Sequence, residues 1–235
     1  PVYIIINSRN GSIHVGENFI SGHQQLSDNT NVYVYIEPQE KPVSTGVLEN
    51  GVIEASKDNA NGTNACAAWR FADGTTTINL RYGISFISEE QAEKNLRSEL
   101  GDYDINKLAE TGRRIWNEAL GRIKVEGGTE NDKTVLYSSF YRTFERPICM
   151  SEDGGLYFSA FDGKVHNDNG IPFYTDDWIW DTYRAAHPLY TLLQPERVPD
   201  MVNTMLDIYD EQGYLPVWHL YGSDTREMIG IQSVP

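Results

Sequence analysis

Aromatic and acidic side chains crowd into residues 174–184, whose sequence is Tyr-Thr-Asp-Asp-Trp-Ile-Trp-Asp-Thr-Tyr-Arg. Asp177, Asp181 and Arg184 have the i, i+4, i+7 spacing of one helix face. Trp178 and Trp180 lie in the same two turns. Aromatic rings pack against the apolar face of a pyranose, and charged groups bind its hydroxyls in bidentate fashion. The stretch therefore predicts a sugar-binding surface.

Plainer interpretations of this stretch stay open. If Thr175 caps the helix, Asp176 and Asp177 fall in its first turn, where the helix dipole stabilises carboxylates. Asp181 and Arg184 would then form an ordinary surface ion pair, worth well under about 1 kcal/mol. The aromatic residues would belong to the core.

A second group of candidate residues follows a predicted helix. Trp218 and His219 are followed closely by Asp224, Arg226 and Glu227. Loops after helices often carry binding groups, so His219, which alone would be a structural histidine, becomes a candidate ligand contact here. The segment 162–166, Asp-Gly-Lys-Val-His, is by itself typical of a turn. The sequence contains no Ser/His/Asp triad, phosphate-binding glycine loop, dinucleotide fingerprint or metal-type Cys/His spacing.

The elements that position these residues are of two kinds, and the first kind is the β-strand. Up to residue 88, short runs rich in Val, Ile, Tyr and Thr alternate with turn-like clusters such as 7–12 and 59–62. This pattern is typical of antiparallel sheets, most simply a β-sandwich. The predicted strands are 2–6, 32–36, 51–54, 65–71 and 75–86.

From Ser88 onward the periodicity is helical. Ser88 stands three positions before Gln91, which is a helix-start signature. Apolar residues then recur at three- and four-residue steps, Gly121 and Gly213 are stop signals, and Pro188 predicts a bend or break. The predicted helices are 89–100, 107–120, 132–144, 178–193 and 196–212. We expect a β-sandwich domain at 1–88, a helical linker at 89–106 and part of a helical domain at 107–235.

Composition excludes some classes of protein. The 235 residues include 34 acidic and 19 basic side chains, a formal net charge of −15, which argues against nucleic-acid binding. No run of about 18 apolar residues is present, so we expect no membrane span. Two cysteines, Cys66 and Cys149, are too few for a disulfide scaffold, and we expect both to be free and buried.

Short motifs between residues 83 and 230 stand in a distinctive order. They occupy 83–88, 91–92, 95–96, 116–123, 126–129, 141–143, 162–166, 174–176, 180–184, 187–188, 195–197, 215–216 and 228–230. In residue types and order they resemble the glycoside hydrolase family 92 α-mannosidases. The first 80 residues resemble that family in their general residue pattern but not in specific motifs.

The resemblance implies an N-terminal antiparallel β-sandwich followed by an (α/α)6 barrel, of which this chain would contain the first helices. It implies inverting, calcium-assisted removal of terminal α-linked mannose (α-1,2-mannosidase-like) from N-glycans or mannans. It also implies an internal fragment, inactive alone, whose general acid and base lie beyond Pro235. The Ca²⁺ ligands would lie mostly outside the chain, and the location would be secreted, periplasmic or on the cell surface.

The resemblance assigns substrate binding but no catalytic or metal-binding residue within the chain. Asp181 would line the mannose subsite, and the other expected substrate contacts are Trp180, Arg184, Trp218, His219, Asp224 and Glu227. The expected partners are a mannose-containing glycan and the remainder of the same polypeptide. Two alternatives stay open: a non-catalytic carbohydrate-binding module, and an (α/α)6 glycosidase of other sugar specificity.

Overall fold

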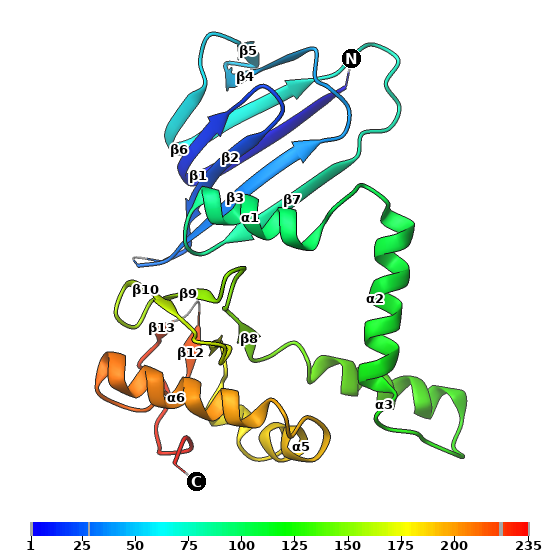
Figure 1. Ribbon diagram of the computed structural model, residues 1–235, viewed down its shortest axis with the longest axis vertical. Coiled ribbons are helices and arrows are strands. Elements are labelled where there is room, and N and C mark those ends of the chain that lie inside the picture. The colour runs from blue at the N-terminus through cyan, green and yellow to red at the C-terminus, as the bar shows by residue number, and fades with distance from the viewer. Residues whose placement is uncertain (1, 28, 221–222, 235) are drawn as a thin grey trace. The chain divides into compact units, whose positions relative to one another are not determined.

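The computed structural model describes residues 2–27, 29–220 and 223–234 (Figure 1). The chain divides into two compact units. The first extends to Tyr103 and includes Glu152–Phe158, and the second combines Asp104–Ser151 with the chain from Ser159 onward. Among the described helices, none has the length and apolar character needed to cross a bilayer.

The first unit is built on a seven-stranded antiparallel sheet with the order β5-β4-β6-β1-β2-β3-β7. Its strands are β1 (Tyr3–Val15), β2 (Ile20–Gln25), β3 (Asn31–Pro38), β4 (Ser44–Glu49), β5 (Val52–Glu54), β6 (Asn59–Arg70) and β7 (Leu80–Ser85). A large antiparallel sheet followed by helices confirms the predicted fold class.

The longest strands, β1 and β6, run through the segments 7–12 and 59–62 that the sequence predicts to be turns, so that prediction is wrong. The two strands pair with each other over most of their lengths, and β1 also pairs with β2. Gly11 permits a close approach, because a Cβ there would lie 2.0 Å from the carbonyl oxygen of His23. Ladder hydrogen bonds to two neighbours outweigh the local turn preference of these polar residues.

Strands β2 and β4 were not predicted. Their sequences, ISGHQQ and STGVLE, lack the alternation of apolar and polar residues that marks a half-buried strand. They form because strands on both sides complete their hydrogen bonds.

Among the described residues of the first unit, two packing clusters stand out. The larger contains Ile13, Val15, Ile20, Ile36, Ala65, Ala67, Trp69 and Phe71. In the smaller, helix α1 (Glu89–Glu99) places Ala92 and Leu96 against Tyr35 of β3. Ser88 caps α1 by accepting a hydrogen bond from the Gln91 backbone, as predicted.

The second unit contains the remaining helices. They are α2 (Ile105–Leu120), α3 (Glu130–Arg142), α4 (Ile179–Thr182), α5 (Ala186–Leu193) and α6 (Val198–Gln212). The short strands of this part of the chain are β8 (Ile148–Cys149), β10 (Lys164–Asn167), β11 (Tyr174–Thr175), β12 (His219–Leu220) and β13 (Ser223–Asp224), while β9 (Leu156–Ser159) spans the boundary between the units.

The predicted helix 178–193 is divided, as expected, but not at Pro188. The interruption lies between α4 and α5, and Pro188 falls in the first turn of α5. The backbone N–H groups of a first turn have no partner within the helix, so a proline there removes no helical hydrogen bond.

Both cysteines are free, as predicted, but the expectation that both are buried is wrong. Cys66 is half-buried and Cys149 is exposed. Cys66 lies between Ala65 and Ala67, which point into the core, so alternation along the strand turns its thiol away. Cys149 lies in a two-residue strand that pairs with β11.

Candidate functional site

Asp181 and Trp218 form the centre of the candidate site. The Trp218 indole Nε1 donates a hydrogen bond to Asp181 Oδ2 at 3.1 Å. Nearby, the Trp180 backbone N–H donates to the Val217 carbonyl oxygen at 3.3 Å. These two bonds fix α4 beside residues 217–218. The Asp181 side chain remains exposed to solvent.

The Trp218 ring is held in place by stacking. The Trp178 and Trp218 ring centroids are 5.2 Å apart and the planes differ by 15°. The Arg146 guanidinium carbon lies 4.3 Å from the Trp178 ring centroid, a cation–π distance. Trp180, at 37% exposure, offers a further indole surface to solvent. An accessible carboxylate therefore lies beside an ordered set of indole rings.

Asp176 and Asp177 do not lie in the first turn of a helix. Thr175 belongs to β11, and α4 begins at Ile179 without a side-chain cap. The alternative in which Thr175 caps the helix is therefore wrong, and so is the prediction that Asp177 shares one helix face with Asp181.

Long-range partners explain this difference. Arg146 Nη1 donates to Asp176 Oδ2 at 3.0 Å. Asp177 accepts from Thr182 Oγ1 at 2.8 Å and lies 2.7 Å from His187 Nε2. Both carboxylates are 4% exposed. A buried carboxylate requires charged or hydrogen-bonding partners, and these partners set the backbone path.

His219 is buried beside the two carboxylates, with 2% exposure. The Asp176 backbone N–H donates to His219 Nδ1 at 3.1 Å, so Nδ1 is unprotonated and the ring is neutral. Burial lowers the pKa of His219 below its ordinary value of 6.5. Its ring also packs edge-on against Phe161, with 5.7 Å between centroids. His219 thus supports the backbone that precedes α4.

Of the other predicted site residues, one supports the centre of the site, and the interactions described for two others do not reach it. Asp224 Oδ2 accepts from the Val217 backbone N–H at 3.3 Å, which fixes the backbone next to Trp218. Arg184 Nε donates to the Tyr183 hydroxyl at 2.7 Å, and among the described ion pairs none joins it to Asp181. Glu227 has an exposed side chain. The structure therefore joins Asp224 to the centre but not Arg184 or Glu227.

Sequence reasoning missed Arg146 and His187 as supports of the site. It also missed Tyr190, whose hydroxyl donates to the backbone oxygens of Thr143 and Arg146 at 3.0 and 2.9 Å. Burial raises the pKa of Tyr190 to about 12. No local pattern marks these residues, because each acts on a segment distant in sequence. The His187-Pro188 motif was the one available signal.

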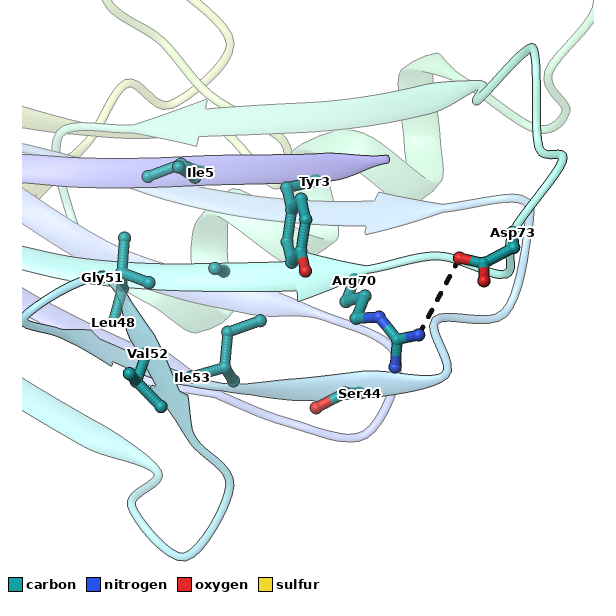
Figure 2. Close-up of a pocket in the computed structure, with 10 residues that line it drawn as sticks. Tyr3, Ile5, Ser44, Leu48, Gly51, Val52, Ile53, Arg70 and Asp73 are labelled. Atoms are coloured by element: carbon teal, nitrogen blue, oxygen red, sulfur yellow. Dashed lines mark ion pairs between the residues drawn. The ribbon is translucent and has the colours of Figure 1, made fainter. Parts of the chain in front are cut away.

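A groove in the first unit has a different character. It has a volume of about 660 Å³ and contains none of the predicted site residues. Figure 2 shows Tyr3, Ile5, Val52 and Ile53 around it, with Arg70 facing Asp73 across 3.9 Å. Its lining is mostly apolar and includes a single carboxylate, Asp73, which faces Arg70, so we do not take it as the candidate site.

Comparison with known proteins identifies the family. Residues 91–235 match the glycosyl hydrolase family 92 catalytic domain, which is more than half of the chain. The chain belongs to glycosyl hydrolase family 92. This family 92 chain also aligns with a protein described as an uncharacterized secreted glycosidase from Arthroderma benhamiae, 26% identical over 151 residues, covering 63% of this chain and 15% of that protein.

Solved structures agree with the family. An inverting mannosidase of the family, BT2199 from Bacteroides thetaiotaomicron, is 30% identical with a TM-score of 0.86 over 99% of this chain and 33% of its own. The α-mannosidase BT3965 of the same organism is 25% identical with a TM-score of 0.87, over 99% and 34%. The family 92 chain described here spans about a third of the length of these structures.

The geometry of this family 92 chain permits binding chemistry. An exposed carboxylate can accept hydrogen bonds from sugar hydroxyls, and indole faces can cover the apolar C–H surface of the ring. Asp176 and Asp177 are already bound to Arg146 and His187, so they hold the site rather than act on a ligand. One group of potential metal ligands, Asp162, His166 and Glu211, lies elsewhere in the second unit.

Proposed function

We propose that the protein containing this chain removes terminal α-linked mannose from N-glycans or mannans with inversion at the anomeric carbon. The observation that carries the proposal is the exposed Asp181 carboxylate fixed by Trp218 beside stacked indoles. Membership of family 92 and the mannosidase neighbours support it. One neighbour structure is a complex with mannoimidazole. The chain spans about a third of the length of that first mannosidase neighbour.

In this proposal Asp181 accepts hydrogen bonds from the mannose hydroxyls, and Trp180 and Trp218 pack on the ring. Asp224 positions the backbone next to Trp218, and His219 positions Asp176. Arg184 and Glu227, both exposed, would contact more distant parts of the glycan. A carboxylate held by an indole keeps its orientation before the sugar arrives, which lowers the entropic cost of binding.

Inversion requires an acid and a base about 6.5–9.5 Å apart on either side of the glycosidic bond. Asp176 and Asp177 are buried and paired, so we do not give them these roles. We propose that this 235-residue chain supplies sugar binding without cleavage, the acid and base coming from other parts of the protein.

Calcium was expected from the resemblance. Ca²⁺ prefers six to eight oxygen ligands at about 2.3–2.6 Å. In the described part of the chain, the one group of three potential ligands includes the His166 imidazole, so the residues present do not fit calcium. We derive no step through this ion. Calcium dependence of the whole protein remains a proposal, and loss of activity on chelation with recovery on adding Ca²⁺ would test it.

The decisive experiment uses the whole protein and a panel of aryl glycosides. We expect cleavage of the α-mannoside, and proton NMR at early times should show β-mannose as the first product. Asp181→Asn should lower kcat/KM at least about tenfold, equivalent to about 1.4 kcal/mol. The exposed Glu17→Gln serves as the matched control, with unchanged kinetics expected. Equal kinetics for both variants would remove Asp181 from the site.

The alternatives predict other outcomes. A different preferred glycoside in the panel would favour another (α/α)6 glycosidase. Mannose binding by a whole protein that cleaves nothing would favour a carbohydrate-binding module. The secreted glycosidase relative supports a further proposal, that the protein acts outside the cytoplasm, in the periplasm, on the surface or in the medium.

A further inference from the structure

Asp162, His166 and Glu211 converge in the second unit, away from Asp181 in sequence. His166 lies on β10 and Glu211 in the last turn of α6, while Asp162 lies within the turn of residues 160–163 that precedes β10. His166 Nε2 lies 3.1 and 3.2 Å from the two Asp162 oxygens and 3.6 Å from Glu211 Oε1. One potential ligand atom from each residue lies within 4.8 Å of the others. Two carboxylates thus face one imidazole nitrogen.

From this geometry we propose that Asp162, His166 and Glu211 bind a divalent transition-metal ion of the zinc class. Zinc binds His nitrogen and carboxylate oxygen at about 2.0–2.2 Å, so tetrahedral ligand atoms lie roughly 3.3–3.6 Å apart. The 3.6 Å from His166 Nε2 to Glu211 Oε1 lies within that range, and the 3.1 and 3.2 Å to the Asp162 oxygens are 0.1–0.2 Å shorter, a difference that a small side-chain rotation removes. One imidazole with two carboxylates suits zinc, manganese or iron better than calcium.

Burial and charge favour a cation at this point. The Asp162 and Glu211 side chains are 13% and 8% exposed. The Asp207 carboxylate also lies near enough to interact electrostatically with Glu211, so three carboxylates share this region. A bound dication would offset this crowding of negative charge.

The proposed metal site is accessible from solvent, and a hydrogen bond orients one of its carboxylates. The His166 side chain is 30% exposed, which leaves a path for an ion and for a water molecule as fourth ligand. Lys164 Nζ lies 3.0 Å from Asp162 Oδ2, but its side chain is 72% exposed, and such surface pairs are weak enough to be displaced. Ser159 donates to Glu211 Oε2 at 2.5 Å and orients that carboxylate.

The ion would have a structural consequence. It would tie β10 to the end of α6, just before Gly213, which ends the helix with φ +89°. From there the chain continues to Trp218. We therefore expect the metal to stabilise the second unit without contact to Asp181, so this inference does not depend on the proposed glycosidase activity.

The test titrates metals into the full chain after chelator treatment and removal of the chelator. Calorimetry should show one equivalent of Zn²⁺ bound, and the thermal unfolding midpoint should rise with Zn²⁺ but not with Ca²⁺. His166→Asn should lose the rise and at least about tenfold in affinity, and Ser159→Ala should lose about tenfold. The matched control is His14→Asn, a histidine of the first unit, which should bind as the unchanged chain does.

A second measurement guards against variants that do not fold. X-ray absorption of the zinc-loaded unchanged chain should show one imidazole and oxygen ligands at about 2.0 Å. Equal zinc affinity of the unchanged chain and a folded His166→Asn, or a zinc shell without a single imidazole, would overturn the proposal. No zinc-dependent change in the unfolding midpoint would also overturn it, and His166 would then be an ion-pair partner of the two carboxylates.

Discussion

The indole N–H of Trp218 binds the carboxylate of Asp181 at 3.1 Å, although 37 residues separate the two in the sequence. The bond connects the segment after α6 to helix α4. It orients an acidic group that remains exposed, and the stacked Trp178 ring fixes the donor.

Trp218→Phe keeps an aromatic ring on Trp178 but removes the N–H group that binds Asp181. Because the bond is exposed, we expect a modest loss, about 1 kcal/mol, in the free energy of unfolding. In the whole protein, KM for an α-mannoside should rise more than kcat falls, since Asp181 loses its fixed orientation. Trp116→Phe on α2 is the control, and equal KM values for the two variants would contradict the prediction.

Arg146→Ala should destabilise the second unit by about 1.5–3 kcal/mol, because it leaves the buried Asp176 carboxylate without its charged donor. Arg146→Lys should recover only part of the loss, since an ammonium keeps the charge but not the planar stacking on Trp178. Urea denaturation measures both. The control Arg184→Ala removes an exposed side chain that donates a hydrogen bond to its neighbour Tyr183, and it should change stability little. Equal losses at positions 146 and 184 would refute this role.

His219 should make the chain less stable in mild acid. Burial holds its folded-state pKa below 6.5, so the unfolded chain binds the proton more readily. The contribution of neutral His219 to the free energy of unfolding is therefore fully present above about pH 6.5, and it falls as the pH decreases below that value. His219→Asn, whose Oδ1 can still accept from the Asp176 N–H, should reduce this slope between pH 7 and 5. An unchanged slope in urea denaturation across that range would show that His219 does not cause it.

Glu37 should anchor α1 to the sheet of the first unit. Arg97 donates to both Glu37 oxygens at 2.7 Å, and Arg81 also donates to this carboxylate. The hydrogen bond from Arg97 lowers the pKa of Glu37, so the stabilisation is present above about pH 4.5 and is lost as the pH falls further.

Glu37→Gln should therefore destabilise the chain by about 1.5–3 kcal/mol at pH 7 and flatten the acid side of the stability profile. Glu93→Gln is the matched control, because Glu93 also binds Arg97 but is 43% exposed. Hydrogen exchange of α1 amides would locate the effect. A larger loss of stability for the Glu93 variant than for the Glu37 variant would contradict the role of Glu37 as the anchor of α1.

Much of the architecture could be predicted from local patterns. Strand-like runs before residue 88 and helical periodicity after it separated the strand-rich part from the helical part, and Ser88 marked the start of α1. Strands β2 and β4 and the short strands from β8 onward were not predicted. The turn prediction for 7–12 and 59–62 is wrong, because the Asn and Gly residues of these segments favour turns when taken alone. Pairing of β1 with β6 and β2 places them in strands, an effect of neighbours that are distant in sequence.

For the candidate site too, some features follow from local sequence and others depend on long-range contacts. The sequence by itself determined that aromatic and acidic residues concentrate at 174–184 and 218–227, and the order of motifs indicated the family. Only the tertiary structure decided which carboxylates are available. Asp176 and Asp177 are buried by Arg146 and His187, whereas Asp181 is exposed and bound by Trp218. Spacing along a chain fixes neighbours within a helix turn, but burial and charge pairing depend on contacts between segments far apart in sequence.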